Sequence, residues 1–172
     1  MIDQSSGRLS ATDDATRPRP EPPAAPESAL RPQRATWLLA GLGILISGYL
    51  TWVHASNTIP FCAGIGQCDL VQSSSYAQIF GLPVAYLGLA TYLALLALIA
   101  LRTSARGVAA EGALLLQFLL LLGGVLFSGW LTYVEVFILE AICPWCVASA
   151  IVITLLFGLT ARDVWRAQRA GG

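Results

Sequence analysis

The chain has 172 residues, of which 56% are hydrophobic and only 12% are charged, and its formal net charge is zero. Roughly a quarter of the residues of an ordinary soluble domain are charged, so this composition excludes a typical soluble globular protein. All ten basic residues are arginines, and none lies between Arg34 and Arg102 or between Arg106 and Arg162. The apolar sequence fills these two gaps. We therefore expect a single-domain integral membrane protein whose surroundings are a lipid bilayer, with no nucleic acid partner.

Residues 1–34 are predicted to form a disordered cytoplasmic tail. Six of the nine prolines lie in this segment, mixed charges accompany them, and no apolar period is present. Such a segment cannot bury enough apolar surface to offset the entropy lost on ordering. A docking role for the tail is the alternative interpretation.

Four apolar segments follow, each close to the roughly 20 residues that cross the hydrocarbon core as a helix. They cover residues 36–53, 82–101, 113–133 and 146–160. The stretch 134–142, which Glu135 and Glu140 interrupt, is a candidate extension of the fourth segment. The sequence therefore predicts an all-α membrane protein. Its four-transmembrane-helix bundle covers residues 35–162, and a second cytoplasmic tail covers residues 163–172.

The arginines predict the orientation of the bundle. They precede the first segment, join the second to the third, and follow the fourth, so the positive-inside rule places both termini in the cytoplasm. Residues 54–81 and 134–145, which contain no basic residue, are then extracytoplasmic. The alternative is that segment 36–53 is a signal peptide cleaved after Ala55, but its apolar stretch is longer than the usual 7 to 15 residues.

The four cysteines, Cys62, Cys68, Cys143 and Cys146, all fall on the extracytoplasmic side of this topology. Three interpretations compete: two structural disulfides, a four-cysteine zinc site and a redox relay. The Cys143-x-x-Cys146 spacing suits a zinc half-site, but the spacing of Cys62 and Cys68 is too wide for the usual zinc knuckle. A structural disulfide is plausible for Cys62 and Cys68, because intervening glycines let the chain turn back.

The sequence Cys143-Pro144-Trp145-Cys146 favours redox chemistry. Pro144 suits the first turn of a helix, so the cysteines would stand at the outer end of the fourth helix. A thiol there lies near the positive end of the helix dipole, which lowers its pKa. The two cysteines are three residues apart and are expected on one helix face. No βαβ pattern surrounds the motif, so the chain is not itself a thioredoxin domain.

Polar and small residues within the spans are expected to serve packing. Gln117 is expected to make a hydrogen bond between helices, and Gly41, Gly43, Gly123 and Gly124 are expected at points of close helix approach.

The sequence resembles the vitamin K epoxide reductase family, and within it the bacterial quinone-linked members. The resemblance is carried by residues 62–68, the serine-containing segment 71–77, residues 80–89 and the block 133–150, and it extends from about residue 36 to residue 161. It implies a four-helix bundle around a quinone, menaquinone or ubiquinone, capped by an extracytoplasmic loop that carries a short helix.

The resemblance also implies an order of electron transfer. Cys62 would exchange with a secreted DsbA-like thioredoxin-fold protein supplied in trans, Cys68 would exchange with Cys143, and Cys146 would face the quinone. Ser74 matches the serine near the quinone in this family. The implied function is a quinone-dependent thiol–disulfide oxidoreductase of the inner (cytoplasmic) membrane that supports disulfide bond formation. The alternatives are a quinone or quinone-epoxide reductase with a thiol donor, and a non-catalytic membrane subunit stapled by disulfides.

Overall fold

Four long helices form the bundle. The computed structural model describes residues 34–58, 60–62, 67–79 and 81–170, so all of the predicted tail 1–34 except Arg34, the first residue of a helix, lies outside the described part. The long helices are α2 (Arg34–Ala55), α4 (Val84–Ser104), α5 (Val108–Phe137) and α6 (Pro144–Ala170). Each is long and apolar enough to cross a membrane. The predicted all-α architecture with four spans is confirmed.

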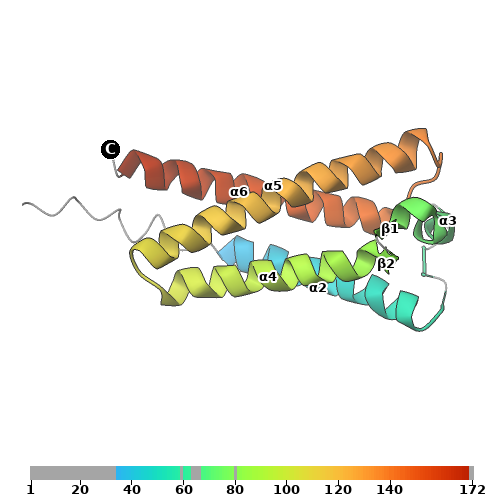
Figure 1. The fold of residues 1–172 in the computed structure, drawn as a ribbon, viewed down its shortest axis with the longest axis horizontal. Coiled ribbons are helices and arrows are strands. Elements are labelled where there is room, and N and C mark those ends of the chain that lie inside the picture. Colours follow the sequence, from blue (N-terminus) through green and yellow to red (C-terminus); the bar gives the residue numbers. More distant parts are fainter. Residues whose placement is uncertain (1–33, 59, 63–66, 80, 171–172) are drawn as a thin grey trace, which may run out of the picture.

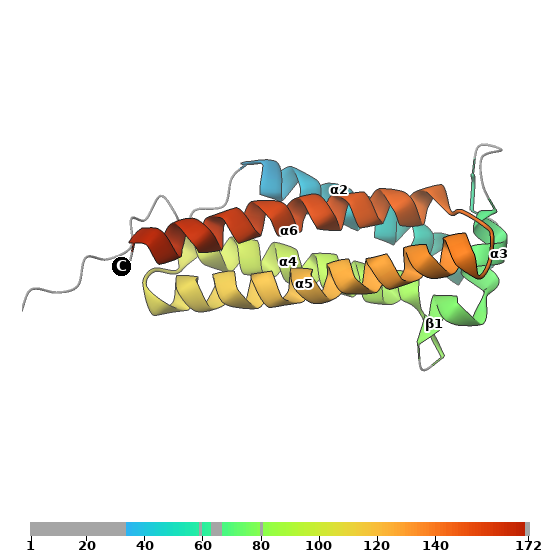
Figure 2. The ribbon, with the colours of Figure 1, turned by 90° about the horizontal axis from the view of Figure 1, so that it is seen from above.

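The helices pack in a closed arrangement in which α2 and α5 each contact both α4 and α6. Figures 1 and 2 show the four helices running side by side along the long axis of the molecule. Many leucines on the outward faces are exposed, among them Leu38, Leu45, Leu119 and Leu126. Helices that are apolar on their outer faces as well as their inner ones are typical of membrane spans.

The segment between α2 and α4 covers one end of the bundle, which we call the loop end. It contains the helix α3 (Cys68–Ser73), the 3-10 turn η2 (Ser75–Ala77) and a small antiparallel hairpin of β1 (Gln78–Ile79) and β2 (Leu82–Pro83). The strands pair Gln78 with Pro83 and Ile79 with Leu82. The predicted short helix in this loop is therefore present, and Figure 1 shows it beside the α5–α6 connection.

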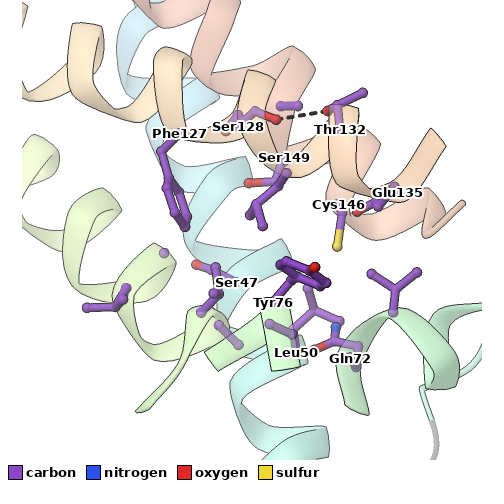
Figure 3. Close-up of a pocket in the computed structure, with 18 of the residues that line it drawn as sticks. Ser47, Leu50, Gln72, Tyr76, Phe127, Ser128, Thr132, Glu135, Cys146 and Ser149 are labelled. Atoms are coloured by element: carbon purple, nitrogen blue, oxygen red, sulfur yellow. Dashed lines mark hydrogen bonds between the residues drawn. The ribbon is translucent and has the colours of Figure 1, made fainter. Parts of the chain in front are cut away.

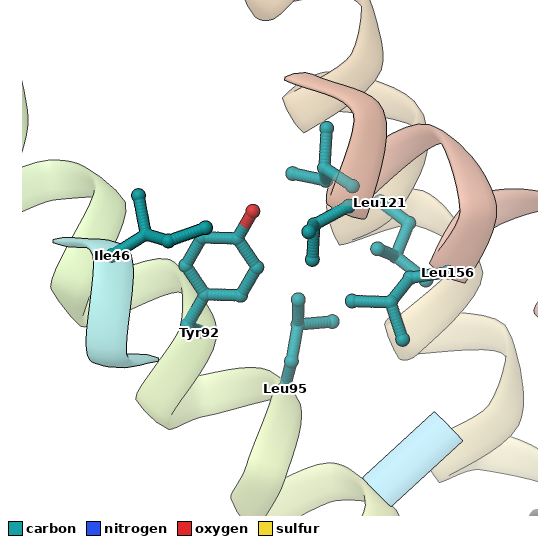
Figure 4. Close-up of a cluster of buried hydrophobic side chains, with 7 residues drawn as sticks. Ile46, Tyr92, Leu95, Leu121 and Leu156 are labelled. Carbon is teal, nitrogen blue, oxygen red and sulfur yellow. The ribbon is translucent and has the colours of Figure 1, made fainter. Parts of the chain in front are cut away.

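The apolar core joins all four helices in the middle of the bundle. Figure 4 shows Tyr92 and Leu95 of α4 facing Leu121 of α5 and Leu156 of α6, with Ile46 of α2 closing the cluster. The Tyr92 hydroxyl donates a hydrogen bond to the carbonyl oxygen of Ser149 at 3.0 Å, which satisfies the polar end of a ring that is otherwise buried.

Of the four glycines expected at points of close helix approach, two lie at such a point. A Cβ atom on Gly43 would overlap the ring of Tyr92, and one on Gly124 would overlap the side chain of Ile153. A Cβ on Gly41 or Gly123 would meet nothing within 4 Å, so the expectation was wrong for those two positions. Sequence spacing alone does not show which face of a span meets a neighbour.

The boundary between the third and fourth spans differs from the prediction. Residues 134–137, expected to extend the fourth segment, complete α5 instead. Val134 and Glu135 are buried against the bundle, and the carbonyl oxygen of Val134 accepts hydrogen bonds from the backbone N–H groups of Ile138 and Leu139, which end the helix. The fourth helix begins at Pro144, after a connection in which Glu140 adopts a positive φ of 49°.

The end of the bundle opposite the loop end is held by a buried polar network. Arg102, one of the arginines that join the second and third predicted segments, is 2% exposed and lies in the last turn of α4. Its guanidinium donates to Asp163 at 2.9 Å and to Gln117 at 3.0 Å. Gln117 in turn donates to Thr160 at 3.0 Å, so the predicted interhelical hydrogen bond of Gln117 is confirmed.

The same network accounts for the length of the last helix. Residues 163–172 were predicted as a tail, whereas α6 continues as a helix to Ala170. Asp163 is 3% exposed because its carboxylate pairs with Arg102, and a charge so deeply buried requires such a partner.

Candidate functional site

The first two cysteines form a disulfide at the loop end. Cys62 and Cys68, which we call the loop pair, are bonded, with a Cα–Cα distance of 6.4 Å. Cys68 is the first residue of α3 and is 2% exposed, whereas Cys62 is partly exposed. The more accessible sulfur of the loop pair therefore belongs to Cys62, and the sulfur of Cys68 faces the interior of the protein.

The segment before Cys62 is fixed to two helices of the bundle. The backbone N–H of Phe61 donates to the hydroxyl oxygen of Tyr49 on α2, and the Phe61 carbonyl oxygen accepts a hydrogen bond from Trp145 Nε1 on α6, both at 3.0 Å. The rings of Tyr49 and Trp145 pack together with centroids 4.9 Å apart. Trp145, between the two cysteines of the CxxC motif, thus also anchors the loop pair.

The other two cysteines, the helix pair Cys143 and Cys146, are free thiols. Cys143 directly precedes α6, is fully buried, and accepts a backbone hydrogen bond from Val147 at 3.1 Å. Cys146 lies in the first turn of α6 and is partly exposed. Pro144 begins the helix as predicted. Of the two cysteines expected on one helix face, Cys146 lies within the helix and Cys143 immediately before it.

The fold brings the two pairs together. Cys68 and Cys143 belong to one buried cluster with Val71 and Ala141, and the remaining two cysteines pack against it. The backbone N–H of Gln67 donates to the carbonyl oxygen of Ile142 at 3.1 Å, which fixes the residues preceding Cys68 and Cys143 beside each other. This arrangement can support disulfide exchange between the inner cysteines of the two pairs, since exchange requires direct contact of the sulfurs.

Glu135 in the last turn of α5 is part of the same cluster of contacts. Its carboxylate oxygen Oε2 accepts a hydrogen bond from the backbone N–H of Cys143 at 3.2 Å, and it also contacts the Cys146 thiol through a hydrogen bond. Its own carbonyl oxygen accepts from the N–H of Ala141 at 3.0 Å. Glu135 is 3% exposed.

Sequence reasoning missed Glu135, treating it only as an interruption of an apolar stretch. The signal was available: an ionisable residue inside an apolar segment near a membrane is costly to bury, and such residues commonly serve function.

The surroundings of the helix pair favour the thiolate form of Cys143. The thiol of Cys146 hydrogen-bonds to Cys143, and this contact holds the pKa of the Cys143 thiol below its usual value even though burial and the charge of Glu135 act in the opposite direction. Because the thiolate is the nucleophile in disulfide exchange, Cys143 is the more nucleophilic thiol of the reduced helix pair.

A pocket of about 150 Å³ lies directly inside the helix pair. Figure 3 shows Cys146 and Glu135 at its loop end, Gln72 and Tyr76 from the loop segment, and Phe127 on its far side. Apolar side chains make up most of the lining. An engineered cavity of similar size in another protein holds one benzene ring, so this pocket is large enough for an aromatic or quinonoid ring.

Ser74 also lines this pocket, at the residue that follows α3. Its hydroxyl donates to the carbonyl oxygen of Val71 at 2.8 Å, which ends the short helix and orients the side chain. The structure therefore brings together all five residues singled out from the sequence: the four cysteines at the loop end, and Ser74 with Cys146 on the wall of one pocket.

The geometry of the site agrees with a comparison to known protein families. The family model described as the vitamin K epoxide reductase family matches residues 34–161 of this chain. The matched region contains all four long helices apart from the last turns of α6, and it includes every cysteine and the pocket.

Proposed function

This chain belongs to the vitamin K epoxide reductase family, and on that premise we propose that it oxidises a secreted DsbA-like thioredoxin-fold protein and passes the electrons to a membrane quinone. The family indicates an oxidoreductase that acts on thiols and disulfides. Its members are membrane proteins linked to quinones. The partner, the direction of electron flow and the bacterial origin are our proposals.

The observation that carries the proposal is that the two cysteine pairs lie in contact with each other. At one side of this cluster is the accessible sulfur of Cys62, and at the other side Cys146 lines the apolar pocket. A partner thiolate would attack Cys62, the more exposed half of the loop disulfide, and leave Cys68 reduced. Cys68 would then exchange with Cys143, and the electrons would leave from Cys146, which lines the pocket. Each exchange proceeds through a mixed disulfide of two neighbouring sulfurs.

In the proposed sequence, a bonded loop pair beside two free thiols of the helix pair would follow oxidation of the loop pair by the helix pair and would precede the transfer of two electrons to the quinone. A bound quinone would supply the oxidant by accepting two electrons and two protons. Ser74, Gln72 and Tyr76 are among the polar side chains that would line its site, and the apolar walls would hold the ring in place.

We further propose the inner (cytoplasmic) membrane of a bacterium as the location, with the loop end on the extracytoplasmic side. Arg34, Arg106, Arg162 and Arg166 are exposed at the other end of the bundle, as the positive-inside rule requires of the cytoplasmic end. An oxidising compartment outside that membrane would also maintain the loop disulfide.

The test uses the full chain in lipid nanodiscs with a reduced DsbA-like protein and a soluble ubiquinone or menaquinone analogue. Quinone reduction is followed by absorbance and partner oxidation by thiol alkylation. We expect one disulfide in the partner for each quinone reduced, and no quinone reduction by Cys146→Ala. If the purified chain oxidises no partner thiols with either analogue, the proposal is wrong and an inert, disulfide-stapled subunit is the better explanation.

A pocket-filling variant separates the two half-reactions. Ala150 lines the pocket on α6, so Ala150→Phe should abolish quinone reduction and still allow one round of thiol exchange with the partner. Ala100→Phe, on an exposed face of α4, is the matched control and should behave like the unaltered chain. Equal quinone reduction by both variants would show that the pocket is not the quinone site.

Reduction of a quinone epoxide is the second candidate, because the matching family is named for that activity. It would use the same cysteines with the same thiol donor. Replacing the quinone analogue by its epoxide in the nanodisc assay distinguishes the two, and we expect turnover with the quinone only.

A further inference from the structure

Glu135 is the one charged side chain on the wall of the pocket. Among the described residues that line it, the other polar groups are hydroxyls, amides and the thiol of Cys146. The titratable groups that face Glu135 are the two thiols of the helix pair, with the hydroxyls of Tyr76 and Tyr92 elsewhere on the same wall. Figure 3 shows the carboxylate beside the sulfur of Cys146, with both at the loop end of the pocket.

Among the described residues, no ion pair accounts for the burial of this carboxyl group. Glu135 is 3% exposed, and in the described part of the chain it forms no salt bridge. Its hydrogen bond to the backbone N–H of Cys143 could be made as well by a glutamine, without the several kcal/mol that burying a charge costs, roughly, in a protein interior. The acidic group therefore provides something that the neutral amide would not.

We propose that the Glu135 carboxylate is a catalytic base of the helix pair, accepting the proton of the Cys146 thiol as the two cysteines are oxidised. This inference rests on the proposed function for the identity of the oxidant. The contacts that support it are a hydrogen bond with the reacting thiol of Cys146 and a hydrogen bond from the backbone N–H of Cys143, which holds the carboxylate beside the pair.

The proton balance of the oxidation of the helix pair shows where a base is needed. Oxidation of the helix pair forms one S–S bond and releases two electrons and two protons, and a quinone takes up both as hydroquinone. Cys143, whose surroundings favour the thiolate, has released one of these protons before the step, and the quinone takes up an equivalent proton from solvent. The other comes from Cys146, whose thiol lines the pocket. Glu135 takes this proton. Because Glu135 lies on the pocket wall, it can pass the proton on to a quinone oxygen.

The charge of Glu135 has a second consequence that can be measured without quinone. A carboxylate next to the helix pair opposes the thiolate of Cys143, and so destabilises the reduced form of the pair. A pair whose reduced form is destabilised gives up electrons more readily. The acidic group is thus expected to make the helix pair more reducing as well as to accept its proton.

The test compares Glu135→Gln with Glu111→Gln, an exposed glutamate in the first turn of the same helix. Without quinone, each variant is equilibrated in thiol–disulfide buffers and the helix pair is quantified by alkylation and mass spectrometry. In Glu135→Gln the equilibrium should shift about tenfold toward the dithiol, which means that the reduction potential of the helix pair rises by about 30 mV. Glu111→Gln should leave it unchanged.

With the quinone analogue, Glu135→Gln should slow quinone reduction about a hundredfold, as loss of a general base does. The rate should recover in part at higher pH, where the thiol ionises without a base. Glu135→Asp, which keeps the acid, should keep the potential of the unaltered chain and regain part of the rate.

An unchanged potential and a rate within twofold of the control would overturn the proposal. So would a slow Glu135→Gln variant with an unchanged potential and no recovery at high pH, because that result indicates a packing role. If the unaltered chain reduces no quinone, the proposed function fails instead, and the potentials of the two variants still test Glu135.

Discussion

Gln67 and Ile142 are joined by a backbone hydrogen bond of 3.1 Å that links the loop segment to the α5–α6 connection. Each is the residue immediately before a buried cysteine, Cys68 or Cys143. This contact holds the two cysteine-bearing segments beside each other. Substitutions at the cysteines should therefore reveal a strong preference for one exchange partner.

The first prediction concerns that preference. In the double variant Cys62→Ala/Cys146→Ala, mild oxidation should join Cys68 to Cys143, because both lie in the same buried cluster. The comparison variant Cys68→Ala/Cys146→Ala should join Cys62 to Cys143 more slowly. Mass spectrometry of the linked peptides measures both rates. Equal rates in the two variants would contradict the assigned order of the relay.

The second prediction concerns the pH dependence of Cys143. Its pKa is lowered by the hydrogen bond from Cys146, so its thiolate persists at a pH where an ordinary thiol is protonated. With both loop cysteines replaced by alanine, Cys146→Ala should raise the pKa of Cys143 by about one unit, and thiolate should be lost as the pH falls through this higher value.

Cys146→Ser is the matched control for that measurement, because its hydroxyl can still donate to Cys143. The thiolate absorbance of the single remaining cysteine, followed as a function of pH, reports the midpoint directly. The same midpoint in the alanine and serine variants would show that the hydrogen bond does not set the pKa.

The third prediction concerns the anchoring of the loop pair. Trp145→Phe removes the Nε1–H donor to Phe61 and keeps a ring against Tyr49. Loss of one hydrogen bond of about 1 kcal/mol should raise the local opening of the segment before Cys62 about fivefold. Hydrogen exchange of this segment measures the change. Trp130→Phe, an exposed position on α5, should leave its exchange unaltered.

The fourth prediction concerns the close contact of α2 with α4. Gly43→Ala would push a methyl group into the ring of Tyr92, which cannot move away freely because its hydroxyl is bonded to Ser149. Overpacking of this kind costs about 1–3 kcal/mol. Thermal unfolding in detergent should show the loss for Gly43→Ala and none for Gly41→Ala, which has open space. Equal stability of the two variants would show that α2 and α4 separate easily.

The fifth prediction concerns the buried ion pair. Arg102→Leu leaves Asp163 as an unpaired buried charge and should cost about 3–5 kcal/mol. The double variant Arg102→Leu/Asp163→Leu should recover most of that loss, since it removes both charges. Arg162→Leu, at an exposed neighbouring position, is the control. A double variant as unstable as the single one would indicate that the hydrogen bonds of Gln117, rather than the charges, hold this end together.

The number of spans and their sequence positions could be predicted from the amino-acid sequence. Apolar runs of about 20 residues must form helices in a membrane, because no water is present to satisfy an unpaired backbone, and the arginine gaps delimit those runs. The start of α6 at Pro144 was also predictable, since proline lacks the N–H that the first turn of a helix leaves unpaired. The cysteines could be singled out because redox and disulfide chemistry require them.

Only the tertiary structure decided which residues meet. Arg102 and Asp163 are 61 residues apart in sequence, and neither residue alone indicates that it is buried with the other. Glu135 stood out in the sequence merely as a charge in an apolar stretch, and its contacts with Cys143 and Cys146 depend on α5 ending one turn later than its apolar run suggested. Hydropathy reports the cost of exposing a residue, whereas its neighbours are set by how the helices rotate and pack, so the clustering of the four cysteines and the place of Glu135 among them emerge only in the folded bundle.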